Sequence, residues 1–237
     1  MVESAAVLCV DVVSSGGTDV DPGNTASPEG QEVQGGQLRL ADVFKTDEPG
    51  RGAYLSRMFA FFSEEIVRHW AACQEAPYCN VGRPVIWDTD GKQFHVLDFT
   101  LERRSDGTRY VAELKCEIEF EKYAFLELTG PSQVLHHEKG AAFQKLLELA
   151  RDPQSRKITI GGKEQKVVGS ILVWGSMTSE GRVDTMAHYG FADVLSIDDM
   201  LADLARWRPE AWAKWIATRR KWTDDLFAFL ASPQRGE

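Results

Sequence analysis

Two carboxylates and one lysine occupy consecutive apolar runs of this chain. Asp98 interrupts the first run, and Glu113 and Lys115 stand in the second, after a turn at residues 105–108. Because side chains alternate along a strand, Glu113 and Lys115 are expected to project from the same face. Two carboxylates can hold a divalent cation, and a nearby lysine can position or deprotonate a water. The pattern therefore indicates a candidate site for metal-assisted hydrolysis.

Each of these residues also has an interpretation without chemistry. Asp98 could lie on the solvent face of its strand, but aspartate is disfavoured in strands, and a lone buried carboxylate is costly unless it is paired or bound to metal. Glu113 and Lys115 could belong to a solvated ribbon, because acidic residues continue the same alternation at Glu117, Glu119 and Glu121. Glu117 would then face water or add a contact to the site.

Hydrophobic periodicity predicts the elements that must position these side chains. The expected order is a helix, a meander of three strands, a helix and a buried strand, followed by further elements. The predicted helices cover 51–75, 135–151, 199–206 and 209–230, and the predicted strands cover 84–88, 93–102, 109–121, 167–174 and 191–197, with a hairpin over 157–168.

The combination of Asp98 with Glu113-Leu114-Lys115 on paired strands resembles the signature of the PD-(D/E)xK nuclease superfamily, although Leu97 stands where that family usually has proline. The core of the superfamily is αβββαβ, with its metal site on the second and third strands, and the expected order over 51–175 is similar. The resemblance implies the α/β class, with a restriction-endonuclease-like αβββαβ core whose central mixed sheet is flanked by helices.

The resemblance also implies roles for individual residues. Asp98, Glu113 and the backbone carbonyl of Leu114 would bind Mg²⁺, or Mn²⁺, and Lys115 would orient the attacking water. The expected reaction is endonucleolytic hydrolysis of DNA that leaves a 5′-phosphate, as in a restriction or defence nuclease, and the sequence leaves restriction, repair and phage defence all open as roles. A glutamate of the first helix often completes such a site, and at about 100° per residue Glu65 lies nearer the apolar stripe than Glu64 does.

Basic residues elsewhere suggest contacts with nucleic acid. His136 and Lys139 are expected on the apolar side of the second helix, where the superfamily often places a polar residue near the scissile phosphate, although a lysine at a helix start can also simply reach water. The adjacent His136 and His137 cannot share one face of an α-helix, so a metal pair is not expected there. In the last helix, tryptophans are expected to form a core stripe, and the outer face carries the candidate phosphate-binding residues Arg219, Arg220 and Lys221.

Composition limits the remaining interpretations. The 237 residues carry 36 acidic and 27 basic side chains, a formal net charge of −9. Residues 1–37 hold six of the acids and no lysine or arginine, so the rest of the chain has 30 acidic against 27 basic residues, a net of −3. This charge is compatible with a nucleic-acid partner. Residues 1–37 are expected to be a Gly/Ser/Pro-rich extension with a candidate strand at 5–13, and 38–237 a single domain.

The four cysteines show no C-x-x-C pair, which favours a reducing cytoplasm. No apolar run is long enough for a membrane span, so no membrane association is expected, and a homodimer is compatible with the sequence. Two other functions stay open at this point. One is a catalytically silent module that binds nucleic acid or protein, and the other is cleavage of RNA rather than DNA. A glycoside hydrolase is disfavoured because a lysine two residues after the glutamate supplies no acid/base carboxylate pair.

Overall fold

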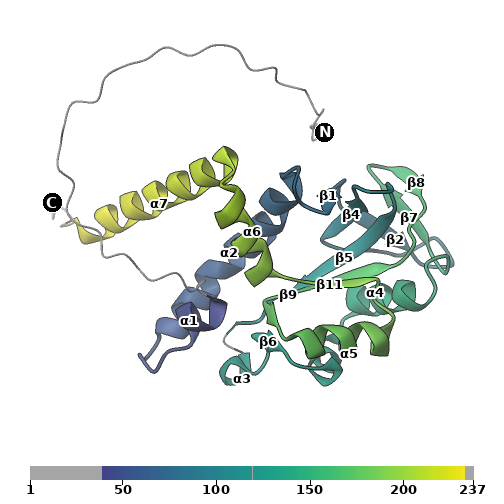
Figure 1. Ribbon diagram of the computed structural model, residues 1–237, viewed down its shortest axis with the longest axis horizontal. Coiled ribbons are helices and arrows are strands. Elements are labelled where there is room, and N and C mark those ends of the chain that lie inside the picture. The colour runs from purple at the N-terminus through teal and green to yellow at the C-terminus, as the bar shows by residue number, and fades with distance from the viewer. Residues whose placement is uncertain (1–38, 119, 233–237) are drawn as a thin grey trace, which may run out of the picture. The chain divides into compact units, whose positions relative to one another are not determined.

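The structure, a computed structural model, describes residues 39–118 and 120–232. The predicted extension at 1–37, with its candidate strand at 5–13, lies outside the described residues. Residues Gln37–Glu237 form one compact unit. It is a mixed α/β unit in which helices flank a central sheet, as the sequence predicts (Figure 1).

The central sheet has five strands in the order β1-β4-β5-β9-β11. β4 is antiparallel to both β1 and β5, whereas β5, β9 and β11 run parallel. All five residues of β9 are buried, which is typical of a strand covered on both faces. The strands are β1 (Tyr78–Asn80), β4 (Phe99–Arg103), β5 (Arg109–Lys115), β9 (Ser170–Trp174) and β11 (Asp193–Ser196).

Helices cover the two faces of this sheet and create two hydrophobic clusters. α2 (Arg51–Ala72) and α6 (Ile197–Trp207) pack together on one face, with the short α1 (Leu40–Phe44) beside them. α4 (Ala141–Arg151) and α5 (Ser179–Tyr189) belong to the other cluster (Figure 1). β5 contributes to both, because alternate side chains point to opposite faces.

A second sheet lies beside the first and corrects the predicted meander. Its order is β3-β2-β7-β8, all antiparallel, with β2 (Pro84–Trp87), β3 (Phe94–Val96), β7 (Lys157–Ile160) and β8 (Lys163–Gln165). The predicted strand at 84–88 therefore does not belong to the central sheet, whose first strand is β1. The predicted strand at 93–102 is two strands in different sheets, and the chain passes between them at Leu97 and Asp98. Leu97 is fully buried, while the Asp98 backbone N–H donates to the Glu113 side chain instead of continuing a ladder.

The region between β5 and α4 also differs from the prediction. β5 ends at Lys115, not near residue 121, and it is followed by α3 (Phe120–Tyr123), β6 (Glu127–Leu128) and the 3₁₀ helix η1 (Pro131–His137). β6 pairs in parallel with β10 (Ser176–Met177). The predicted helix at 135–151 begins only at Ala141, because Gly140, a poor helix former, ends the turn after η1 and donates its N–H to the His137 carbonyl.

The last two helices begin close to their predicted starts: α6 (Ile197–Trp207) two residues earlier and α7 one residue later. The Ser196 hydroxyl caps α6 by accepting from the Asp199 N–H, and Pro209 precedes α7 (Glu210–Ala231). The expected core stripe on α7 is wrong, because no residue of this helix is buried. Trp215 is only partly covered, and in the second half Trp222 is 57% exposed and Leu230 is 63% exposed. An apolar stripe predicts a face but does not supply an element to cover it. In the part of the chain that the structure describes, no helix is both long and apolar enough to cross a membrane.

Candidate metal centre

Asp98 and Glu113 meet at the point where β4 and β5 separate. The antiparallel register of the two strands ends at the pair Phe99 and Ala112. Glu113 lies one residue beyond that pair on β5, and Asp98 lies one residue before it on the approach to β4. The break between β3 and β4 thus opens the edge of β5 at the candidate residues.

Hydrogen bonds connect Asp98, Glu113 and Lys115. Asp98 Oδ2 accepts from the Leu114 backbone N–H at 2.9 Å, and Glu113 Oε2 accepts from the Asp98 N–H at 3.3 Å. Lys115 Nζ donates to Glu113 Oε1 at 2.8 Å. Asp98, Glu113 and Lys115, which are separated by up to 17 residues in the chain, therefore form one hydrogen-bonded group.

Burial disfavours the charged form of Glu113. Glu113 is only 6% exposed, and burial together with the neighbouring Asp98 carboxylate raises its pKa, although the Lys115 ammonium acts in the opposite direction. Arg83 Nη2 lies 3.4 Å from Asp98 Oδ1 and supplies a second positive charge. The charged form of Glu113 is disfavoured even with these neighbours, so a cation beside it would be stabilised.

The donor atoms suit a hard divalent cation. The N–H and C=O of one strand residue point to the same edge, so the Leu114 carbonyl lies on the edge that its N–H shares with Asp98. Two carboxylates and one carbonyl are oxygen ligands of the kind that Mg²⁺ and Mn²⁺ prefer. The Lys115 ammonium lies 5.8 Å from the centre of the Phe143 ring on α4, which places it on the face that α4 covers.

Glu65 is not part of this group. Its carboxylate pairs with Arg68 on its own helix, and its charge acts on His69, which contacts tryptophans of α7. α2 covers the sheet face to which Leu114 contributes, whereas Glu113 and Lys115 alternate to the other face. Glu65 is less exposed than Glu64, as the helical angle predicts. That angle does not predict which face of the sheet the helix covers.

The other predicted nucleic-acid-binding residues lie on different elements from the carboxylates. Lys139 is exposed in the turn between η1 and α4 rather than on a helix. Arg219 is half-buried on α7, and its guanidinium lies 5.0 Å from the centre of the Trp215 ring and 4.3 Å from the centre of the Trp222 ring. Arg220 and Lys221 are exposed on α7, which packs against α2 through Trp215 and Phe62.

The structure adds residues that sequence reasoning missed. Arg83 precedes β2, and no local pattern connects it with a carboxylate 15 residues later. His137 is buried between the rings of Phe143 and Trp174. Burial, Lys115 and His136 together lower the pKa of His137 to about 4, so its imidazole is neutral at pH 7. The predicted α-helix over 135–151 would place His136 and His137 on different faces. Because these two residues instead lie in η1, their proximity to Glu117 was not predicted.

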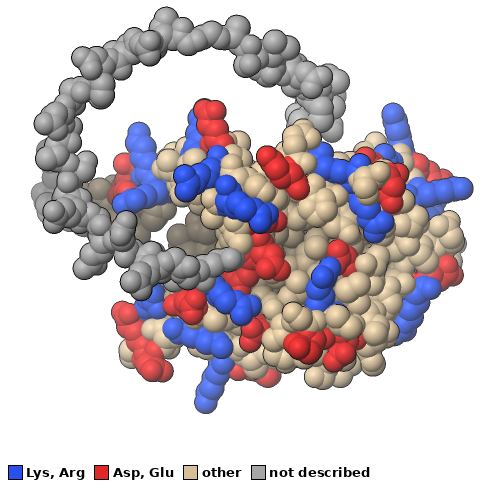
Figure 2. Space-filling model, viewed as in Figure 1, with Lys and Arg blue, Asp and Glu red and all other residues tan. Residues whose placement is uncertain are grey.

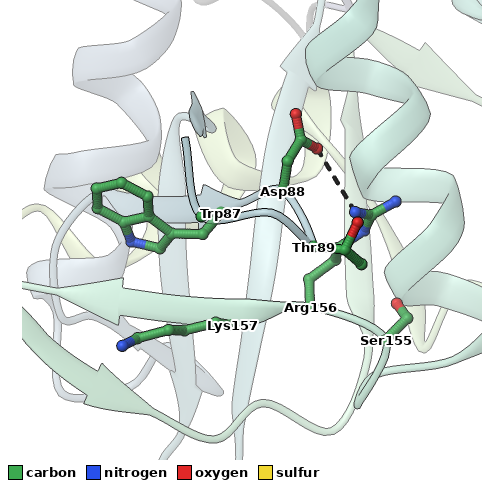
Figure 3. Close-up of a pocket in the computed structure, with 7 residues that line it drawn as sticks. Trp87, Asp88, Thr89, Ser155, Arg156 and Lys157 are labelled. Carbon is green, nitrogen blue, oxygen red and sulfur yellow. Dashed lines mark ion pairs between the residues drawn. The ribbon is translucent and has the colours of Figure 1, made fainter. Parts of the chain in front are cut away.

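A separate cavity of about 370 Å³ lies on the second sheet, lined by Trp87, Asp88, Thr89, Gly91, Ser155, Arg156 and Lys157. Figure 3 shows Asp88 and Arg156 directed toward one another, and their ion pair measures 3.5 Å. Lys145 also contacts Asp88, at 3.1 Å, and lowers the pKa of that carboxyl. Lys157, which also lines the cavity, pairs with Glu164 on β8. The charged residues of the lining therefore already have ion-pair partners, and none of the metal-centre residues lines the cavity.

On the face drawn in Figure 2, lysine and arginine side chains alternate with aspartate and glutamate, and the described residues form no extended patch of one sign there. Comparisons with protein-family models, with curated proteins and with solved structures find no match to this chain.

Proposed function

We propose that this protein is a Mg²⁺-dependent endonuclease that hydrolyses phosphodiester bonds of DNA, with a role in restriction or defence. The observation that carries the proposal is the hydrogen-bonded group of Asp98, Glu113 and Lys115 on two diverging strands. Paired carboxylates with an adjacent ammonium suit a reaction in which negative charge develops on a phosphate. Mn²⁺ could replace Mg²⁺ at the same ligands.

Each residue has a distinct part in this hypothesis. Asp98, Glu113 and the Leu114 carbonyl would hold the cation, which supplies Lewis-acid polarisation of the phosphate and a lower pKa for a bound water. Lys115 would give up its bond to Glu113 Oε1 and orient the attacking water. Arg83, which is 55% exposed, could turn from Asp98 to a phosphate of the substrate.

The order of elements supports the proposal. α2, β1, β4, β5, α4 and β9 follow one another as αβββαβ. Two strands of the second sheet are inserted before β4 and two before β9, and α3, β6 and η1 are inserted between β5 and α4. Asp98 lies at the start of the second central strand and Glu113 on the third. This is the arrangement that the restriction-endonuclease-like resemblance implies, and we infer that the chain adopts that fold.

One observation favours a second candidate, a catalytically silent module that binds nucleic acid or protein. Lys115 and Arg83 already give each carboxylate a positive partner, so the group is neutral without a divalent cation. A silent module would keep these pairs as structural ion pairs. It would show no metal binding that depends on Glu113.

Cleavage assays on purified protein distinguish the two candidates. The wild type is incubated with supercoiled plasmid, linear DNA and RNA, in Mg²⁺ or in EDTA, beside Asp98→Ala and Lys115→Ala. The matched control is Glu164→Gln, which removes an exposed carboxylate on β8. We expect cleavage of DNA in Mg²⁺ by wild type and control, and loss of cleavage in EDTA and in both site variants. Cleavage by either site variant at the wild-type rate would refute the assignment.

A further inference from the structure

Two histidines and a glutamate converge just beyond the end of β5. Glu117 follows β5 by two residues, and His136 and His137 end η1. One ligand atom from each of the three lies within 4.8 Å of the other two. The residues come from segments about 20 positions apart, so the tertiary fold, and not local sequence, brings them together.

The distances within this group are close to those of a metal site. Glu117 Oε2 lies 3.4 Å from His136 Nε2, and Glu117 Oε1 lies 3.9 Å from His137 Nδ1. Ligand atoms about 2.1 Å from a tetrahedral ion are separated by roughly 3.4 Å. Small side-chain rotations would therefore bring the three ligands to bonding distance.

Burial gives a second, independent indication of a ligand. His137 is 9% exposed, and its Nε2 atom is buried without a hydrogen-bond partner among the described residues. Glu117 Oε2 is likewise buried and accepts no hydrogen bond there. Buried polar groups without partners are rare in native proteins and are often explained by an ion or water. A cation between the two segments would satisfy the buried Glu117 Oε2, and it would bind His137 through Nδ1, the nitrogen that lies 3.9 Å from Glu117 Oε1.

We propose that Glu117, His136 and His137 form a binding site for a transition-metal cation of the Zn²⁺ type. Two imidazoles and one carboxylate form a three-ligand set of the kind that holds Zn²⁺ and leaves a fourth position open. This set differs from the all-oxygen donors at Asp98 and Glu113, which suit Mg²⁺. The bound ion would fasten η1 to the end of β5, two residues from Lys115. The inference does not depend on nuclease activity.

Competition with a chromophoric chelator tests the site on the full-length chain after removal of metals. We expect the wild type to take up an equivalent of Zn²⁺ that His136→Ala and Glu117→Gln bind at least about tenfold more weakly. Co²⁺ in place of Zn²⁺ should give the visible absorption of a tetrahedral site in the wild type and not in these variants. His136 is half-exposed, so its removal should leave the fold intact, which far-ultraviolet circular dichroism checks.

Two controls separate this site from its neighbours. His188→Ala removes an exposed histidine from α5, and Asp98→Ala removes the carboxylate of the candidate magnesium site. Both should retain the Zn²⁺ equivalent. The proposal is overturned if the wild type takes no Zn²⁺ from the chelator, if His136→Ala binds it as tightly as the wild type, or if Asp98→Ala alone abolishes binding. These measurements of Zn²⁺ binding do not depend on whether the protein cleaves DNA, so a negative nuclease assay would not change how they are interpreted.

Discussion

Replacing Glu113 by glutamine should stabilise the metal-free protein and remove its response to Mg²⁺. The substitution keeps the shape of the side chain, and its amide oxygen can still accept from the Lys115 ammonium. The amide nitrogen then takes the place of the oxygen that accepts the weaker, 3.3 Å hydrogen bond from the Asp98 N–H. Because the pKa of Glu113 is raised in the folded state, its surroundings favour the neutral form over the charged one. A neutral isostere should therefore raise the free energy of unfolding at pH 7 when no cation is bound.

The magnitude of the Mg²⁺ response follows from mass action. A ligand present at 100 times its Kd stabilises the folded state by about 2.7 kcal/mol. For a protein of this size, each kcal/mol changes Tm by about 2–4 °C, so saturating Mg²⁺ should raise the wild-type Tm by about 5–11 °C. The variant lacks one of two carboxylate ligands, and its shift should fall below about 2 °C.

Thermal melts followed by circular dichroism measure both effects. Wild type, Glu113→Gln and the surface control Glu164→Gln are compared at pH 7 in EDTA and over a Mg²⁺ titration at constant ionic strength. The control should behave as the wild type does. A Glu113→Gln protein that melts below the wild type in EDTA, and still gains the full Mg²⁺ shift, would refute the electrostatic reasoning.

Three further predictions concern pH, Arg83 and a buried glycine. In EDTA, the free energy of unfolding of the wild type should fall as pH rises from about 4.5 through the raised pKa of Glu113. Over this range the folded state still holds a proton that the unfolded chain has lost. Urea melts of Glu113→Gln should not show this decrease. Arg83→Gln should bind Mg²⁺ more tightly, because it removes a cation that competes for Asp98, yet should bind DNA more weakly in a filter assay; unchanged values of both would contradict this role. Gly181→Ala should lower the urea midpoint strongly, since its Cβ would lie 2.2 Å from a β6 carbonyl oxygen, whereas Gly130→Ala, with open space around it, should not.

The elements with strong periodicity could be predicted from sequence. α2 and the fully buried β9 follow from apolar spacing. The proximity of Asp98, Glu113 and Lys115 was also predictable, because a short hairpin joins their strands. What the pattern could not supply was the sheet to which each strand belongs. An apolar run at 93–102 reads as one strand, but tertiary pairing divides it at Leu97.

The missed parts of the candidate sites depend on long-range packing. Glu65 has a suitable position on its helix, yet that helix covers the wrong face of the sheet. Arg83 reaches Asp98 only because the chain changes sheets between β3 and β4. His137 reaches Glu117 only because η1 is a 3₁₀ helix that ends before Gly140. Local propensity cannot specify such contacts, because each depends on two segments that are distant in the chain.

The most direct test of the metal-dependent nuclease hypothesis follows plasmid nicking and thermal stability in the same Mg²⁺ titration. If Asp98 and Glu113 hold the catalytic cation, nicking rate and Tm should rise together with one half-saturation concentration in the wild type. Neither should rise in Glu113→Gln. Plasmid that stays intact at saturating Mg²⁺ and Mn²⁺, or nicking that continues in EDTA, would contradict the hypothesis.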